Sequence, residues 1–165
     1  MEVIHLKYPH QLTSTGSEYS LALGFFDGVH LGHQRVIGAA IENAKKLNLK
    51  SAVMTFDPHP SIVLGRRNEK VFYITPLQQK LETLEQLGVD TVFVVNFTSD
   101  FAKLSPEDFV QYFIRDLHVK HVTAGFDYSF GAFGKGNMDF MQQLAGDDFG
   151  VTVVSKLEAD SDKVS

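Results

Sequence analysis

Two histidines, His30 and His33, stand three residues apart in the stretch GFFDGVHLGH, residues 24–33. If both lie in the first turn of a helix, their imidazoles project from nearly the same face. The glycines let the backbone approach a ligand closely, and a helix start offers unpaired N–H groups and a positive dipole end to a phosphate. Imidazoles placed there stabilise oxygens that gain negative charge during phosphoryl transfer. The stretch therefore favours a phosphate-handling site.

The spacing of the two histidines alone leaves two other interpretations open. They can be partly exposed residues at a helix start, preceded by a turn at Asp27 and Gly28. They can also ligate zinc with Asp27 as a third ligand, although the sequence holds no HExxH pattern. The familiar glycine-rich phosphate loops are excluded, because neither GxxxxGK[ST] nor GxGxxG after the first strand occurs.

Two later stretches carry further candidates. TFDPHP, residues 55–60, has two prolines that stiffen a loop after a strand. GFDYSFGAFGKG, residues 125–136, interleaves aromatic residues with glycines; each aromatic alone is typical of a core, but as a set they can wall a ligand pocket. Lys135 and the pair Arg66 and Arg67 are cations that either meet an anion or are solvated.

Strand-like runs alternate with helical patterns along the chain. We predict strands at 20–26, 51–56, 90–95, 121–126 and 151–155, and helices at 33–48, 75–88, 105–117 and 137–150. Helix-length crossovers between strands predict an α/β fold with a doubly wound, parallel five-stranded sheet covered on both faces. Ligands bind such sheets beyond the carboxyl ends of the strands, where the strand order reverses. The loops that begin after residues 24, 56, 95 and 125 should meet there.

The second and third predicted helices carry start and stop signals. We expect Thr75 to cap a helix with Pro76 at its first position and Gln78 completing a capping box, and Gly88 to end it. A Ser-Pro pair starts the helix at 105 in the same way. The inner faces are predicted to hold Leu77, Leu81, Leu84 and Leu87 in one helix and Phe109, Val110, Phe113, Ile114 and Leu117 in the other.

Composition limits the class of protein. A length of 165 residues with 44 % hydrophobic residues predicts one globular domain. The net charge of −5 gives no broad basic field for nucleic acid or an anionic membrane, so we expect small anionic ligands held by a local site. No cysteine, no signal-peptide core in MEVIHLKYPH and no membrane-length apolar run lead us to expect a cytoplasmic protein.

The motifs together resemble a known family. His30-Leu31-Gly32-His33 is similar to the His-x-Gly-His signature of the nucleotidyltransferase superfamily. GFFDGVHLGHQ, TFDPHP and GFDYSFG with its later glycine resemble, in order and separation, the loops of bacterial FAD synthetases, the N-terminal adenylyltransferase module of bifunctional riboflavin kinase/FMN adenylyltransferase. The resemblance covers essentially the whole chain. It implies a Rossmann-like nucleotidyltransferase fold and transfer of AMP from ATP to FMN, giving FAD and pyrophosphate, with Mg²⁺ on the triphosphate.

The resemblance also implies roles for individual residues. The signature histidines His30 and His33 would stabilise the phosphates and the transition state. Nucleotide-binding residues would be Gly24, Phe25, Phe26, Asp27, Gly28, Gly32 and Asp127. Residues around the flavin would be Phe56, Asp57, Pro58, His59, Pro60, Phe126, Tyr128 and Phe130. The ligands of Mg²⁺ stay unassigned, since Asp57 alone is a poor ligand set.

The end of the sequence, DKVS, departs from the family pattern. The family's second nucleotide motif, a Ser-Ser-Thr run followed by an Arg, would begin at Ser165, and the riboflavin kinase module that normally follows in cis is absent from these residues. We therefore expect the 165 residues alone to transfer adenylyl groups weakly or not at all. Two alternatives stay open: a flavin- or nucleotide-binding module with impaired catalysis, and an adenylyltransferase for another phosphorylated substrate.

Overall fold

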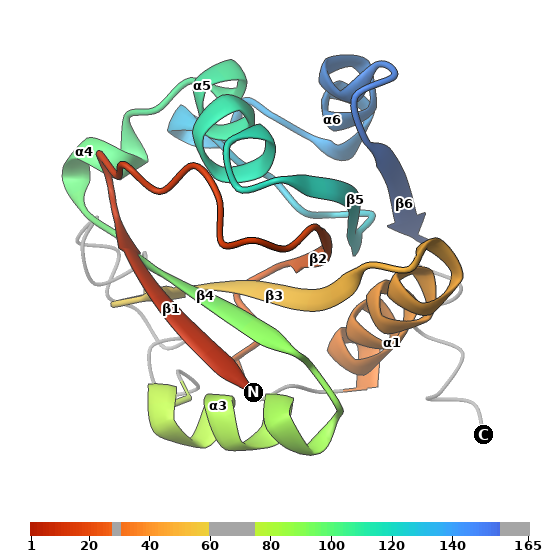
Figure 1. Cartoon of the computed structure of the whole chain (residues 1–165). Helices are drawn as coiled ribbons and strands as arrows, with labels where there is room; N and C mark the ends of the chain where they lie inside the picture. Colours follow the sequence, from red (N-terminus) through yellow and green to blue (C-terminus); the bar gives the residue numbers. More distant parts are fainter. Residues whose placement is uncertain (28–30, 60–74, 156–165) are drawn as a thin grey trace.

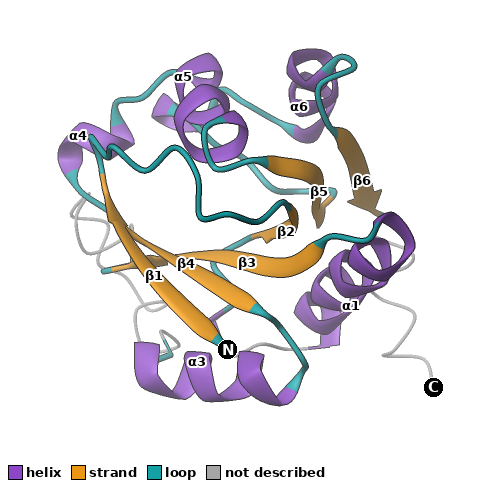
Figure 2. Ribbon diagram, in the orientation of Figure 1, coloured by secondary structure: helices purple, strands orange, loops and turns teal. Residues whose placement is uncertain are grey.

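The computed structural model describes residues 1–27, 31–59 and 75–155, which form one parallel sheet with helices on both faces (Figures 1 and 2). The sheet order is β1-β4-β3-β2-β5-β6, and every neighbouring pair is parallel. The strands are β1 (Glu2–Lys7), β2 (Tyr19–Leu23), β3 (Lys50–Asp57), β4 (Thr91–Asn96), β5 (Val119–Gly125) and β6 (Gly150–Val154). The predicted α/β class is confirmed, whereas the predicted number of five strands is wrong.

The strand that the sequence did not reveal is β1. Among the described strands it lies at the edge of the sheet and pairs with β4 alone. Edge strands tolerate charged residues because one side of the strand faces solvent. Glu2, His5 and Lys7 are exposed and only Leu6 is fully buried, so the hydrophobic pattern of this strand is weak.

The helices divide between the two faces of the sheet (Figure 1). One face carries α1 (Leu31–Leu47) and α3 (Leu77–Gln86). The other carries α4 (Ser99–Ala102), α5 (Pro106–Val110), its π-helical continuation η3 (Gln111–Arg115) and α6 (Met138–Ala145). A short 3₁₀ turn, η4 (Ala132–Gly134), precedes α6. None of the helices within the described ranges is long and apolar enough to cross a membrane.

Side chains of the central strands alternate between the two faces of the sheet and pack into two separate hydrophobic cores. In β2, Leu21 and Leu23 pack toward α5 and α6, whereas Ala22 packs toward α1. The first core is largely aromatic; Phe109 stacks on Phe113 with ring centroids 5.8 Å apart. Every predicted inner-face residue of the two punctuated helices lies in or against these cores.

Two of the helix signals are confirmed, and the three predicted for the start of α3 are not. The Ser105 hydroxyl accepts a hydrogen bond from the Asp108 amide at the start of α5, and Gly88 follows α3 with φ of +94°. The predicted start of α3, with Thr75 as the cap, Pro76 at the first helical position and Gln78 in a capping box, is wrong. Pro76 takes the N-cap position with an extended ψ of 143°, so the helix begins one residue later, and the Gln78 amide donates to Glu82 instead.

Candidate active site

The strand order reverses on either side of β2. The chain moves from β2 through β3 to β4 on one side and then returns to β5 and β6 on the other. The loops after β2 and β5 are therefore splayed apart at the carboxyl edge, which is where ligands bind in such sheets. A cavity of about 790 Å³ opens at this edge, a volume typical of a small-molecule site.

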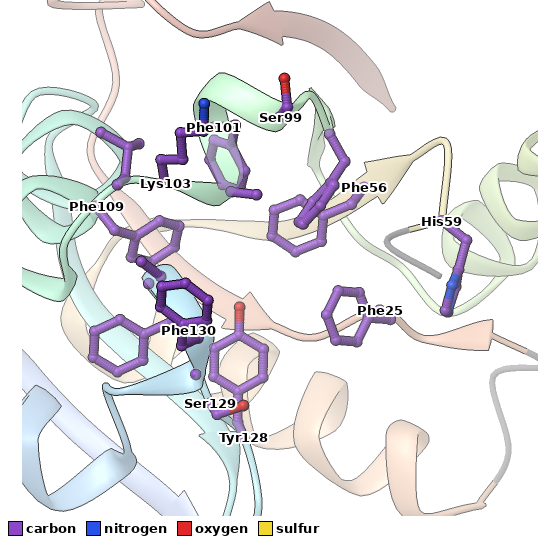
Figure 3. A pocket seen from close by; sticks show the side chains of 17 residues that line it. Phe25, Phe56, His59, Ser99, Phe101, Lys103, Phe109, Tyr128, Ser129 and Phe130 are labelled. Atoms are coloured by element: carbon purple, nitrogen blue, oxygen red, sulfur yellow. The ribbon is translucent and has the colours of Figure 1, made fainter. Parts of the chain in front are cut away.

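Aromatic side chains make most of the wall of this cavity (Figure 3). Phe25 and Phe56 have ring centroids 5.3 Å apart, and Tyr128 lies 6.3 Å from Phe25 and 6.4 Å from Phe130. The lining residues are Phe25, Phe56, His59, Phe97, Ser99, Phe101, Ala102, Lys103, Leu104, Phe109, Tyr128, Ser129, Phe130, Gly131, Ala132, Phe133 and Gly134. Flat apolar walls of this kind suit a planar aromatic ligand.

The predicted flavin residues divide into two groups. Phe56, His59, Tyr128 and Phe130 line the cavity, and so does Phe25, which was assigned to the nucleotide. Asp57, Pro58 and Phe126 are not among the lining residues, and Pro60 lies outside the described residues. The pleat of β3 explains the exclusion of Asp57, because successive strand residues point to opposite faces.

The segment after β4 supplies walls that sequence reasoning did not assign. Phe97, Phe101, Lys103 and Phe109 line the cavity from α4, its flanks and α5. The available signal was position, because this segment also follows a strand at the same sheet edge. Phe101 shows why aromatic content alone was not enough: its ring is buried in the core and lines the cavity as well.

The loop after β5 presents an exposed aromatic ring at the cavity. Phe130 and Gly136 exchange backbone hydrogen bonds of 3.1 and 2.9 Å, which closes the loop. The Ala132 amide donates to the Leu104 carbonyl at 2.6 Å and ties the loop to the α4–α5 segment. Phe133 stands between these anchors with φ of +57° and is 90 % exposed, although it lines the cavity.

Tyr128 brings a hydroxyl into this apolar site. Burial raises the pKa of the Tyr128 phenol well above its usual value of 10.0. The phenol is therefore neutral at all ordinary pH values and offers an O–H donor to a ligand. In Figure 3 this hydroxyl points toward the space between Phe130 and Phe25.

The adjacent residues Phe25 and Phe26 have different places. Phe25 lines the cavity, whereas Phe26 is 2 % exposed and packs in the core beneath α1. The chain turns at Phe26 with φ of +56° and sends the ring inward, so the predicted nucleotide contact of Phe26 would involve its backbone and not its ring. A Cβ at Gly24 would lie 2.8 Å from this ring, so Gly24 is required here for packing.

The start of α1 holds the described part of the histidine signature. Gly32 and His33 lie in its first turn, which contains no acidic residue that would oppose an anion. The half-buried His33 ring packs edge-on against Phe26 at 5.4 Å. Gly28 and His30 lie outside the described residues, as do Arg66 and Arg67.

Two predicted nucleotide carboxylates lie in different surroundings. Asp127 is exposed directly after β5 at the site edge. Asp27 instead contacts protein groups: its Oδ2 lies 3.0 Å from His59 Nε2, and its Oδ1 lies 3.2 Å from the Lys80 ammonium. Across the described ranges no three His, Cys, Asp or Glu side chains gather to hold a metal ion.

Comparisons with known proteins agree with this geometry. The family model described as FAD synthetase matches residues 13–165. The chain is 49 % identical over its whole length to a bifunctional riboflavin kinase/FMN adenylyltransferase of Listeria monocytogenes and 47 % identical to that of Bacillus subtilis, covering 53 % and 52 % of those proteins. It thus spans about half the length of these curated relatives.

A solved structure has the same fold. The crystal structure described as a macrolide-efflux protein from Streptococcus pneumoniae superposes with a TM-score of 0.82 and 31 % identity, over 94 % of this chain and 52 % of that one. The family match extends over nearly all of the sequence, and the described residues of the motifs that first suggested it lie at one edge of the sheet. This chain belongs to the FAD synthetase family.

Proposed function

We propose that this chain transfers the AMP moiety of ATP to the phosphate of FMN, giving FAD and pyrophosphate. The observation that carries the proposal is the aromatic cavity at the carboxyl edge of the sheet, next to the turn that leads into α1. Family membership supports it, because the relatives named above are described as FMN adenylyltransferases.

The cavity favours a flavin over other phosphorylated acceptors. Rings from the β2, β3 and β5 loops and from α4 surround the space, so a planar isoalloxazine can stack on several of them. The flexible chain of phosphopantetheine or the small headgroup of choline has no flat ring to use these walls. A nicotinamide has a flat ring, but its single ring covers less of these walls than the three fused rings of an isoalloxazine. The neutral Tyr128 hydroxyl offers the flavin one hydrogen-bond donor.

The chemistry requires alignment and charge neutralisation. An oxygen of the FMN phosphate forms a bond to the α-phosphorus of ATP while the bond to the bridging oxygen of the β-phosphate breaks, and that electron pair leaves with pyrophosphate. No covalent bond to the protein is needed, because the acceptor phosphate is already an anionic nucleophile. His33, together with the helix start, stabilises the charge that develops, and His30 shares that role on the strength of the sequence motif.

Mg²⁺ accompanies the ATP triphosphate in this proposal and neutralises part of its charge. The described residues offer no group of three His, Cys, Asp or Glu side chains for a cation, and in this proposal Mg²⁺ would be bound by the ATP phosphates. For the whole protein we propose a cytoplasmic enzyme with a riboflavin kinase domain in cis. The bifunctional relatives, of which this chain spans about half, support the second domain.

The proposal is tested with the natural gene product that contains these residues. Incubation with FMN, ATP and Mg²⁺ should give FAD, measured by the fall in flavin fluorescence, and an equal amount of pyrophosphate. FMN binding without pyrophosphate release would instead identify a binding module. The 165 residues tested alongside show how far transfer depends on the motif expected after Ser165.

A further inference from the structure

Lys80 is a buried cation beside the site. It is 3 % exposed, although most lysines are solvated because burial of an unpaired ammonium is costly. It lies in α3 on the same face as Leu77 and Leu84, where the hydrophobic pattern would place an apolar residue. Such a residue needs compensating partners, and their identity shows what the lysine does.

The partners of Lys80 come from the turn after β2 and from strand β3. The ammonium donates to the Phe25 carbonyl at 2.8 Å and to Thr55 Oγ1 at 3.1 Å, and it forms an ion pair with Asp27 Oδ1 at 3.2 Å. The Thr55 hydroxyl also donates to the Phe25 carbonyl, at 2.9 Å. The other oxygen of Asp27 contacts His59 Nε2 at 3.0 Å. A single ammonium thus links α3, the turn after β2 and strand β3, and Asp27 extends these contacts to His59 in the loop after β3.

The Phe25 carbonyl is the centre of this arrangement. Two donors hold it, which fixes the plane of the peptide that joins Phe25 to Phe26. That plane is coupled to the positive φ of Phe26, a conformation rare for a bulky residue. It sends Phe25 into the cavity and Phe26 into the core beneath α1.

We infer that Lys80 is a positioning residue that fixes the flavin cavity relative to the phosphate-handling start of α1. The inference rests on the proposed function. Phe25 and His59 belong to the cavity wall, and Asp27 leads into the turn before α1, so the ammonium holds both halves of the site at one point. The FMN phosphate must reach the α-phosphorus of ATP, and small misplacements of reacting groups cost turnover heavily.

Loss of Lys80 should therefore lower kcat more than it weakens FMN binding. Much of the cavity wall, including Phe101, Tyr128 and Phe130, comes from α4 and the β5 loop, whereas the contacts of Lys80 described above are with the turn after β2 and with β3. In Lys80→Met of the natural gene product we expect kcat per FMN-binding site to fall at least about tenfold, and the KM for FMN to change less than about threefold.

Thr55→Val provides a milder second test if Lys80→Met does not fold. It keeps the side-chain shape but removes the hydroxyl that bonds both Lys80 and the Phe25 carbonyl. We expect a drop in kcat of about threefold or more at unchanged FMN KM. Thr91→Val is the matched control. Thr91 is also a buried strand threonine, but it lies at the amino end of β4, whereas Thr55 lies near the carboxyl end of β3.

The outcomes separate the inference from the proposed function. If the unmodified protein makes no FAD, the proposed function fails whatever the variants do. If it makes FAD and Lys80→Met, or Thr55→Val where the former does not fold, retains kcat per FMN-binding site within twofold, the positioning role is wrong. A loss that appears only as fewer FMN-binding sites, with normal turnover at each, also overturns it, because that is the signature of a purely structural lysine.

Discussion

Phe133 and Phe126 form a matched pair that tests which residues of the β5 loop hold the flavin. Both are exposed phenylalanines, 90 % and 45 % respectively, but only Phe133 lines the cavity. We expect Phe133→Ala to weaken FMN binding and Phe126→Ala to leave it unchanged. The prediction reverses the sequence-based assignment, which included Phe126 and omitted Phe133.

The size of the effect follows from the exposed ring of Phe133. If the isoalloxazine covers one face, about 80 Å² of apolar surface leaves water, which at about 25 cal/mol per Å² is worth about 2 kcal/mol. That free energy corresponds to about a 30-fold rise in Kd. We expect Phe133→Ala to leave the stability of the fold unchanged, because truncation of an exposed side chain changes the free energy of unfolding by less than about 0.5 kcal/mol.

Titration of FMN into each variant, with binding monitored by the quenching of flavin fluorescence, measures the two dissociation constants directly. Thermal unfolding of the same samples checks that the fold is intact. Equal affinities for Phe133→Ala and the unmodified protein would refute the assignment of the cavity rim. A larger loss in Phe126→Ala would show that the flavin lies outside the cavity described above.

Three further predictions concern catalysis, pH and packing. His33→Ala should lower kcat about 100-fold while FMN affinity changes little, because the imidazole acts mainly in the transition state; steady-state kinetics with FMN titration checks this, and an affinity loss at normal kcat contradicts it. Since burial raises the folded pKa of Tyr128 above its ordinary 10.0, its stabilising contribution is complete below pH 10 and is lost as the pH rises above that value. Above pH 10 the free energy of unfolding, measured by urea titration, should therefore fall with pH more steeply in the unmodified protein than in Tyr128→Phe. Equal slopes of this free energy against pH in the two proteins would contradict the prediction. Phe113→Ala, which empties a fully buried position stacked on Phe109, should cost about 3–5 kcal/mol of unfolding free energy by urea titration, and a cost below 1 kcal/mol would show that the aromatic core is not packed as described.

The sheet and its helices were largely predictable because their signals are periodic. Leu77, Leu81 and Leu84 recur at helical spacing, and they pack against the core as expected. The edge strand β1 was not predicted, because the charged residues Glu2 and Lys7 weaken the hydrophobic pattern of this segment. An edge strand tolerates such charges because one of its sides faces solvent. The described parts of the motif loops lie where we predicted them, because they follow strands that end at one edge.

The roles of individual site residues were harder to predict, because they depend on long-range contacts. No local pattern separates Phe25, which lines the cavity, from its neighbour Phe26, which lies in the core; the bonds from Lys80 and Thr55 to the Phe25 carbonyl set that difference. Lys80 had a signal that was available: it occupies an inner-face position of an amphipathic helix. The positioning role of Lys80 could not be predicted from this signal, because it depends on Asp27, which lies 3.2 Å from the ammonium in the folded chain.

The most direct test of the account uses ATP labelled at the α-phosphate. The natural gene product containing these residues, supplied with FMN, Mg²⁺ and this ATP, should place the label in FAD, release unlabelled pyrophosphate and leave none on the protein. The same experiment with His33→Ala should give the same labelled product far more slowly. Label that stays in ATP while FMN is bound, or label attached covalently to the protein during turnover, would contradict direct adenylyl transfer at this site.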